Sequence, residues 1–162
     1  LHLLISGTNN TLIIKSFIDK KKPYINQVDS KGNTPLHLAS MLGKIDILKI
    51  LLNNKANYSL TNKDGKKPLH LAVESRHTQV CQHLLRHTNY QQSELEETLQ
   101  IVKLRIEQFK SFRKQFLSSS QNTEERQIII LSILKDLQDI ERLIQGKINL
   151  LKEKYVAQLV KR

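Results

Sequence analysis

The feature that most constrains this chain is a short motif that occurs twice at a fixed distance. GNTPLHLAS occupies residues 32–40 and GKKPLHLAV occupies residues 65–73, so the two copies lie 33 residues apart. The match continues downstream, where residues 47–52 align with residues 80–85. An incomplete copy, LHLLIS, begins at Leu1 and lies 35 residues before the next one. The first 92 residues therefore hold two full repeats and most of a third.

Each repeat predicts a tight turn followed by two helices. Gly32 and Gly65 permit the positive φ of a tight turn. Pro35 and Pro68 suit the first position of a helix, where no hydrogen-bond donor is lost, and Thr34 suits the N-cap. The second helix has apolar residues at helical spacing, namely Ile47, Leu48, Leu51 and Leu52. One such unit is too small to bury this face alone, so we expect neighbouring repeats to stack.

A period of 33 residues with a TPLHxA core is typical of ankyrin repeats, and residues 1–92 resemble that family. The resemblance implies an all-α ankyrin-repeat solenoid of about three repeats. Two residues depart from the pattern in the copy at 62–88. Lys67 replaces the Thr of TPLH, so this turn loses its hydroxyl cap, and Arg76 replaces the glycine found at Gly43. We interpret residues 62–88 as the last repeat, covered by the segment that follows.

The remaining chain, residues 93–162, predicts a long antiparallel helical hairpin that resembles a coiled coil. Ser93 and Glu96 form a candidate capping box, and so do Asn122, the last residue of the polar loop at 118–122, and Glu125. The first helix has one apolar stripe: Leu95, Leu99, Val102, Ile106, Phe109 and Phe116. The stripe of the second helix is Ile130, Ile133, Leu137, Ile140, Ile144, Ile148, Leu151 and Tyr155. We therefore expect two domains, at 1–92 and 93–162.

The start of the second hairpin helix is apolar on most of its circumference. A hairpin needs only one apolar stripe, whereas a helix that is apolar all round is buried on several sides. We expect a surface for self-association here, or for contact with a further part of the chain. Its residues are Ile128, Ile129, Ile130, Leu131 and Leu134.

Charge and cysteine content narrow the possible classes of protein. The chain has 26 Lys+Arg and 15 Asp+Glu, a net charge of +11. Residues 1–92 contribute 13 − 5 = +8, and residues 93–162 contribute 13 − 10 = +3. No apolar run approaches the roughly 20 residues of a membrane-spanning helix.

The single cysteine, Cys81, excludes an internal disulfide and favours a reducing cytoplasmic or nuclear location. Because Leu1 falls inside a repeat, we expect a fragment of a longer protein.

The sequence contains no clear pattern of catalytic or metal-binding residues. His77 and Cys81 are four residues apart, as are His83 and His87, but the two pairs point to different faces of one helix. Cys81 also aligns with Leu48, a core position. The glycines are not clustered for phosphate binding, and no serine has a nucleophile-elbow context. We predict no enzymatic activity, no cofactor and no metal.

The resemblance to ankyrin repeats implies binding through the turn residues and the exposed end of each first helix. We expect Met41 and Leu42 to be exposed beside lysines. Such a surface suits a protein partner that has an apolar patch surrounded by acidic residues. The histidines of the PLH motif, His37 and His70, are implied to support turn hydrogen bonds. The predicted binding residues are Ser30, Lys31, Asn33, Met41, Leu42, Lys63, Asp64, Lys66, Glu74 and Ser75.

Three hypotheses about function follow. The first is a non-catalytic scaffold or adaptor, whose hairpin caps the repeats or mediates assembly into a homo-oligomer. The second is the targeting part of a larger enzyme, for example an effector that an intracellular bacterium injects into the host cytosol. The third is electrostatic binding to nucleic acid or an anionic membrane through the basic turns. We rank the third below a protein partner because aromatic residues for base stacking are sparse. Its residues are Lys20, Lys21, Lys22, Lys31, Lys63, Lys66 and Lys67.

Overall fold

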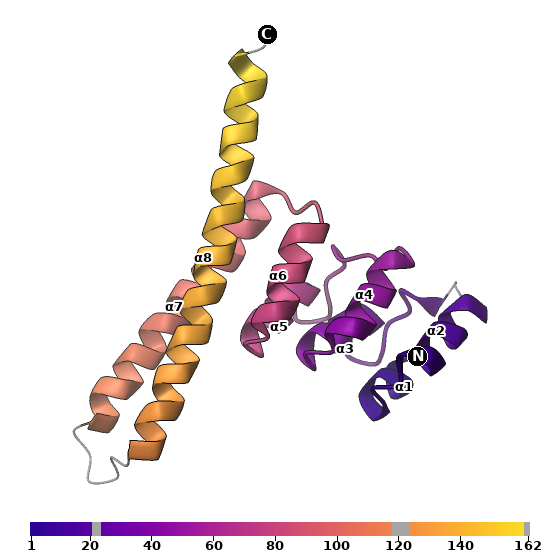
Figure 1. The fold of residues 1–162 in the computed structure, drawn as a ribbon, viewed down its shortest axis with the longest axis horizontal. Coiled ribbons are helices and arrows are strands. Elements are labelled where there is room, and N and C mark those ends of the chain that lie inside the picture. Colours follow the sequence, from indigo (N-terminus) through magenta and orange to yellow (C-terminus); the bar gives the residue numbers. More distant parts are fainter. Residues whose placement is uncertain (21–23, 118–123, 161–162) are drawn as a thin grey trace. The chain divides into compact units, whose positions relative to one another are not determined.

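The computed structural model describes residues 1–20, 24–117 and 124–160, and all regular secondary structure within them is helical. The chain divides into two compact units, Leu1–Thr88 and Asn89–Arg162. The all-α prediction is therefore confirmed, and each unit is described by itself below (Figure 1).

The first unit consists of three helix pairs that follow the repeats of the sequence. The pairs are α1 (His2–Gly7) with α2 (Thr11–Lys20), α3 (Pro35–Met41) with α4 (Ile45–Asn53), and α5 (Pro68–Glu74) with α6 (Thr78–His87). The first helices pack on one another, α1 on α3 and α3 on α5. The second helices do the same, α2 on α4 and α4 on α6. The unit is thus a stack of repeats in two helical layers (Figure 1).

The core of this stack lies between the two layers. Each repeat contributes apolar side chains that its own helices cannot cover, and these residues are almost completely buried. Leu48 and its equivalent Cys81 are both fully buried, as the alignment of Cys81 with a core position predicts. The largest buried side chains are Ile5, Ile14, Ile18, Leu36, Ile47, Leu48, Leu51, Leu69 and Leu84.

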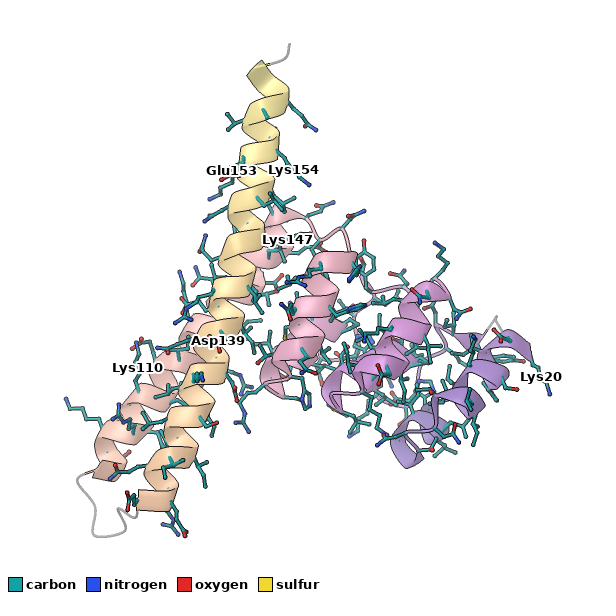
Figure 2. The ribbon with its side chains drawn as sticks, viewed as in Figure 1. Lys20, Lys110, Asp139, Lys147, Glu153 and Lys154 are labelled. Carbon is teal, nitrogen blue, oxygen red and sulfur yellow. The ribbon has the colours of Figure 1, made fainter. Side chains whose placement is uncertain are left out.

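The second unit is an antiparallel hairpin of α7 (Gln92–Leu117) and α8 (Glu124–Val160), which confirms the predicted helical hairpin (Figure 1). Lys152 lies 4.0 Å from Glu96, so the later part of α8 runs beside the beginning of α7 and the two helices are antiparallel. The buried seam of α7 is Leu95, Leu99, Val102 and Ile106, and that of α8 is Ile130, Leu134, Leu137, Ile140, Ile144 and Ile148. Charged side chains such as Lys147, Glu153 and Lys154 project from α8 (Figure 2).

Some details of the hairpin differ from the expectation. The cap of α7 lies earlier than Ser93 and Glu96, because the Gln91 N–H donates to the Glu94 carboxylate at 2.7 Å. Tyr155, placed in the apolar stripe, is 64% exposed. The reason is length: α8 has 37 residues and α7 has 26, so α8 continues past the start of α7. The second predicted capping box, at Asn122, and the polar loop lie outside the described residues.

Candidate protein-binding surface

The turn that precedes α3 is held by the Asp29 side chain. Its Oδ1 accepts hydrogen bonds from the N–H groups of Lys31 and Asn33, both at 2.8 Å. The Gly32 N–H donates to the Asp29 carbonyl at 2.9 Å, which closes the turn. The left-handed φ of +77° at Gly32 is the conformation that glycine adopts without strain. These bonds fix the backbone from which the Lys31 side chain projects.

The next turn repeats this arrangement with an amide in place of the carboxylate. Asn62 Oδ1 accepts from the N–H groups of Asp64 at 3.0 Å and Lys66 at 2.9 Å. The two turns are also bonded to each other: the Lys63 N–H donates to the Lys31 carbonyl at 3.1 Å. Lys31 and Lys63 are both exposed and follow one another along this turn edge.

The histidine of the PLH motif connects each turn to the following repeat. His37 Nδ1 accepts a hydrogen bond from the Thr34 N–H at 3.1 Å, so the ring proton resides on Nε2. Nε2 then donates to the Lys66 carbonyl at 2.9 Å. In the first repeat, His2 Nε2 donates in the same way to the Asn33 carbonyl at 2.8 Å. These histidines therefore hold the turn edge together across neighbouring repeats.

Burial affects the protonation of His37. Its pKa is lowered from the ordinary 6.5, mainly because burial disfavours the charged imidazolium, while the bond to the Lys66 carbonyl acts in the opposite direction. The neutral ring is also the form that can accept from the Thr34 N–H. The structure thus gives His37 a role in connecting repeats through its neutral tautomer.

Nine of the ten predicted binding residues fall into three groups by exposure, and the tenth, Asn33, is buried. Ser30, Lys31, Lys63 and Asp64 are exposed at the turns. Met41 and Leu42 are 38% and 40% exposed at the end of α3. Lys66, Glu74 and Ser75 are half-buried at α5.

Lys66 and Glu74 form an ion pair, with Lys66 Nζ 2.8 Å from the Glu74 carboxylate. Lys66 precedes α5 and Glu74 is its last residue, so the pair spans the length of that helix. Glu74 aligns with Met41 at the spacing of 33, and α3 and α5 pack side by side. Met41 and Glu74 therefore occupy equivalent positions on adjacent first helices.

Asn33 lies in the interior and not on the surface expected of a binding residue. Only 6% of its area is exposed. Its Nδ2 donates to Asp29 Oδ2 at 3.2 Å, and its Oδ1 accepts from Asn62 Nδ2 at 2.9 Å. Both polar atoms are used within the turn edge, so we leave Asn33 out of the surface proposed below.

The sequence did not reveal the residues that position the end of each first helix. His77 Nε2 donates to the Met41 carbonyl at 3.1 Å. Lys44, one repeat earlier, donates from Nζ to the Ile5 and Thr8 carbonyls at 2.6 and 3.0 Å. Lys44 and His77 align at the spacing of 33. The sequence therefore shows a hydrogen-bond donor just after the end of the first helix in both copies, and this pattern could have predicted the contacts.

On α8, the five residues of the expected assembly surface divide into two sets. Ile128, Ile129 and Leu131 are exposed, at 61%, 58% and 46%. Ile130 and Leu134 are buried within the hairpin seam. The exposed set therefore remains available on this unit.

Two further properties of the described residues concern metal binding and membrane crossing. No group of three or more His, Cys, Asp or Glu side chains in the described part of the chain is arranged to hold a metal ion. Among residues 1–20, 24–117 and 124–160, no helix is both long enough and apolar enough to cross a membrane.

Comparison with known proteins identifies the class. Residues 1–94 match the family described as "Ankyrin repeats (3 copies)", which is more than half of the chain. This chain belongs to the ankyrin repeat family. Ankyrin repeats are in general protein–protein interaction modules, and their proteins are mostly non-enzymatic.

Several curated proteins resemble the repeat region. "Ankyrin repeat domain-containing protein 13B" of Homo sapiens is 39% identical over 67 residues, 41% of this chain and 11% of that protein. "Transient receptor potential cation channel subfamily A member 1" of Homo sapiens is 34% identical over 87 residues, 54% of this chain and 8% of that protein. "Rabankyrin-5" of Mus musculus is 36% identical over 62 residues, 38% of this chain and 5% of that protein. The chain thus spans a small part of the length of each.

Proposed function

We propose that this chain is a non-catalytic protein-interaction module that acts as a scaffold or adaptor. The observation that carries the proposal is the exposed apolar pair Met41 and Leu42 on a backbone fixed by His77, in a repeat whose turn also presents Lys31. A backbone that is already fixed loses little conformational entropy on binding, which favours affinity. The proposed surface consists of Ser30, Lys31, Met41, Leu42, Lys63, Asp64, Lys66, Glu74 and Ser75.

We propose further that the partner is an acidic protein with an apolar spot. Lys31 and Lys63 are exposed on adjacent turns, and residues 1–92 have an excess of 13 basic over 5 acidic side chains. Lys66 contributes less, because its charge is paired with Glu74. Complementary charges would mainly speed association and select the partner, while burial of Met41 and Leu42 would supply affinity.

Two variants of the full chain test the surface in a pull-down from nuclease-treated lysate. The first carries Met41→Ala, Leu42→Ala, Lys63→Glu and Lys66→Glu. The matched control carries Leu12→Ala, Ile13→Ala, Lys15→Glu and Lys20→Glu on α2, where Leu12 and Ile13 are exposed and Lys20 lies at the helix end (Figure 2). A protein lost with the first variant and retained by the control supports the proposal. Equal retention by both would move the binding site away from this surface.

An alternative is that the chain is the targeting part of a larger protein, including an enzyme such as a bacterial effector. The support is that similar repeats occur as small parts of much longer proteins, one of which is named as a member of a cation channel subfamily. The complete open reading frame tests this alternative directly. A catalytic domain in the same frame would assign these repeats to targeting, whereas its absence would favour the scaffold.

We propose a second role for the hairpin, which is either to cover the last repeat or to mediate homo-oligomer formation. The exposure of Ile128, Ile129 and Leu131 within one turn of α8 favours assembly. Light scattering of the full chain over a range of concentrations would detect it. Ile128→Asn with Ile129→Asn should lower the mass toward a monomer, and Leu104→Asn, at an exposed site on α7, should not. A monomer at every concentration contradicts the assembly role.

Binding to nucleic acid or an anionic membrane ranks third, supported only by the basic turns.

We propose that the protein works in a reducing compartment, which is the cytoplasm or nucleus, or the host cytosol if it is an effector. In support, Cys81 is a buried free thiol whose pKa burial raises to about 12, so it is kept in the protonated form.

A further inference from the structure

A shallow cavity lies on the layer of second helices, between α4 and α6. Its volume is about 280 Å³. None of the residues proposed above for partner binding lines it. Apart from Ile45, all its lining residues are polar or charged: Lys49, Gln79, Gln82, His83, Arg86 and His87.

Positive groups dominate this cavity. Lys49 and Arg86 are cations at neutral pH, and the two imidazoles add charge when protonated. The one carboxylate that pairs with a cavity cation in the described part of the chain is Asp46, whose Oδ1 lies 3.4 Å from Lys49 Nζ. The Asp46 side chain is 71% exposed, so water screens this pair and leaves the cavity positive.

The two histidines lie against each other. The ring centroids of His83 and His87 are 4.2 Å apart with the planes tilted by 33°. The pKa of His83 is lowered, first by burial and then by the positive charges of His87 and Lys49. A bound anion would reverse the effect of these charges and favour the protonated rings.

Helix α5 also packs against α6, but its titratable groups have other partners. His70 accepts from the Lys67 N–H at 3.3 Å, and Glu74 pairs with Lys66. The charged groups that act on His83 are therefore His87 and Lys49, while Arg86 lines the same cavity and Asp46 pairs with Lys49.

We propose that this cavity between α4 and α6 binds a phosphoryl-type dianion, held by Lys49 and Arg86 and by the protonated rings of His83 and His87. A guanidinium can donate two parallel hydrogen bonds to such a group, and the ammonium adds a point charge. The side-chain amides of Gln79 and Gln82 supply neutral donors at the same wall. The ligand is either a soluble phosphate compound or a phosphorylated side chain of another protein.

Sulfate titrations of the full chain test the site, because sulfate keeps its charge of −2 over the working pH range. Histidine ring resonances followed by NMR should shift saturably at His83 and His87. Binding should be at least fivefold tighter at about pH 5.5 than at about pH 7.5, since one added charge at 4 Å contributes about 1 kcal/mol in water. Shifts that rise linearly with sulfate, or equal affinity at both pH values, would overturn the proposal.

Substitutions locate the site. Arg86→Gln and Lys49→Gln should each weaken sulfate binding by about fivefold or more. Lys63→Gln, which removes an exposed lysine from the turn edge, should leave binding unchanged. Circular dichroism of each variant confirms folding. A loss that Lys63→Gln reproduces would show general charge attraction and contradict a built site.

Pyrophosphate and a phosphoserine peptide then distinguish the two sources of ligand in the same assay. Tighter binding of pyrophosphate would indicate a soluble phosphate compound. Tighter binding of the phosphopeptide than of its unphosphorylated form would indicate a modified protein. Failure of both to displace sulfate would refute a phosphoryl site.

Discussion

At the scale of single residues, the same amino acid has different consequences in successive repeats. Gly32 and Gly65 both adopt a left-handed φ, +77° and +71°. A Cβ on Gly32 would lie 2.9 Å from the Lys63 backbone nitrogen, whereas a Cβ on Gly65 would meet nothing within 4 Å. The difference arises because the turn of the next repeat lies against Gly32.

Gly32→Ala should therefore destabilise the chain more than Gly65→Ala. Both substitutions incur the cost of a left-handed alanine, about 1–2 kcal/mol. Gly32→Ala also displaces the Lys63 N–H from the Lys31 carbonyl, and loss of that bond adds about 1 kcal/mol. Urea unfolding of both variants measures the difference. Equal losses would show that the close approach to the next turn does not contribute.

His37 should make the stability of the repeats depend on pH. Its folded-state pKa is lowered below 6.5, so the unfolded chain binds the proton more readily. The stabilisation is complete above about pH 7 and is lost as the pH falls through 6.5 toward the folded-state pKa. The free energy of unfolding should thus decrease between about pH 7.5 and 5.

His37→Gln should flatten this dependence. The pKa of His83 is also lowered, so His83→Gln is the control that leaves the contribution of His37 intact. Urea titrations at several pH values compare the three proteins. An unchanged slope in His37→Gln would exclude His37 as the group responsible.

At the scale of helices, the caps of α3 and α5 differ as the sequence indicates. Thr34 Oγ1 accepts from the His37 N–H at 3.4 Å, while Lys67 makes no equivalent side-chain cap because an ammonium cannot accept. The His70 ring still accepts from the Lys67 N–H. Helix α5 thus retains half of the capping box.

Lys67→Thr should restore the missing half and stabilise the chain. A Thr N-cap contributes about 0.5–2 kcal/mol relative to a residue that cannot cap. Lys63→Thr, an exposed turn position in the same repeat, is the matched control and should change stability little. Thermal unfolding of both variants provides the measurement. A Lys67→Thr protein no more stable than wild type would contradict the capping argument.

At the scale of the whole molecule, the dependence of binding on salt distinguishes an apolar contact from attraction by the net charge of +11. Salt should weaken the affinity for a partner that buries Met41 and Leu42 only slightly. A ligand held mainly through phosphates loses about 10³–10⁵ in affinity between 50 and 200 mM salt. We expect a partner's Kd to rise by about tenfold or less over that range. A loss of a thousandfold or more would favour nucleic acid.

The sequence by itself determined the helical class, the stacking of about three repeats and the hairpin that follows. These features depend on short-range chemistry, such as Pro35 at a helix start, Gly32 in a turn, and apolar stripes at helical spacing. The period of 33 residues then requires each repeat to cover the next, which is why the core position of Cys81 was also predictable from Leu48.

Only the tertiary structure decided which polar and apolar side chains reach the surface. In the sequence, Asn33 resembles an exposed turn residue. In the structure, its side-chain amide is hydrogen-bonded to both Asp29 and Asn62. On α8, the contact with α7 buries Ile130 and Leu134 and leaves Ile128, Ile129 and Leu131 exposed. The cavity between α4 and α6 likewise joins Lys49 to His83 and Arg86 from different repeats. The physical reason is that each exposure depends on which residue of a neighbouring element lies opposite, and local sequence does not specify that residue.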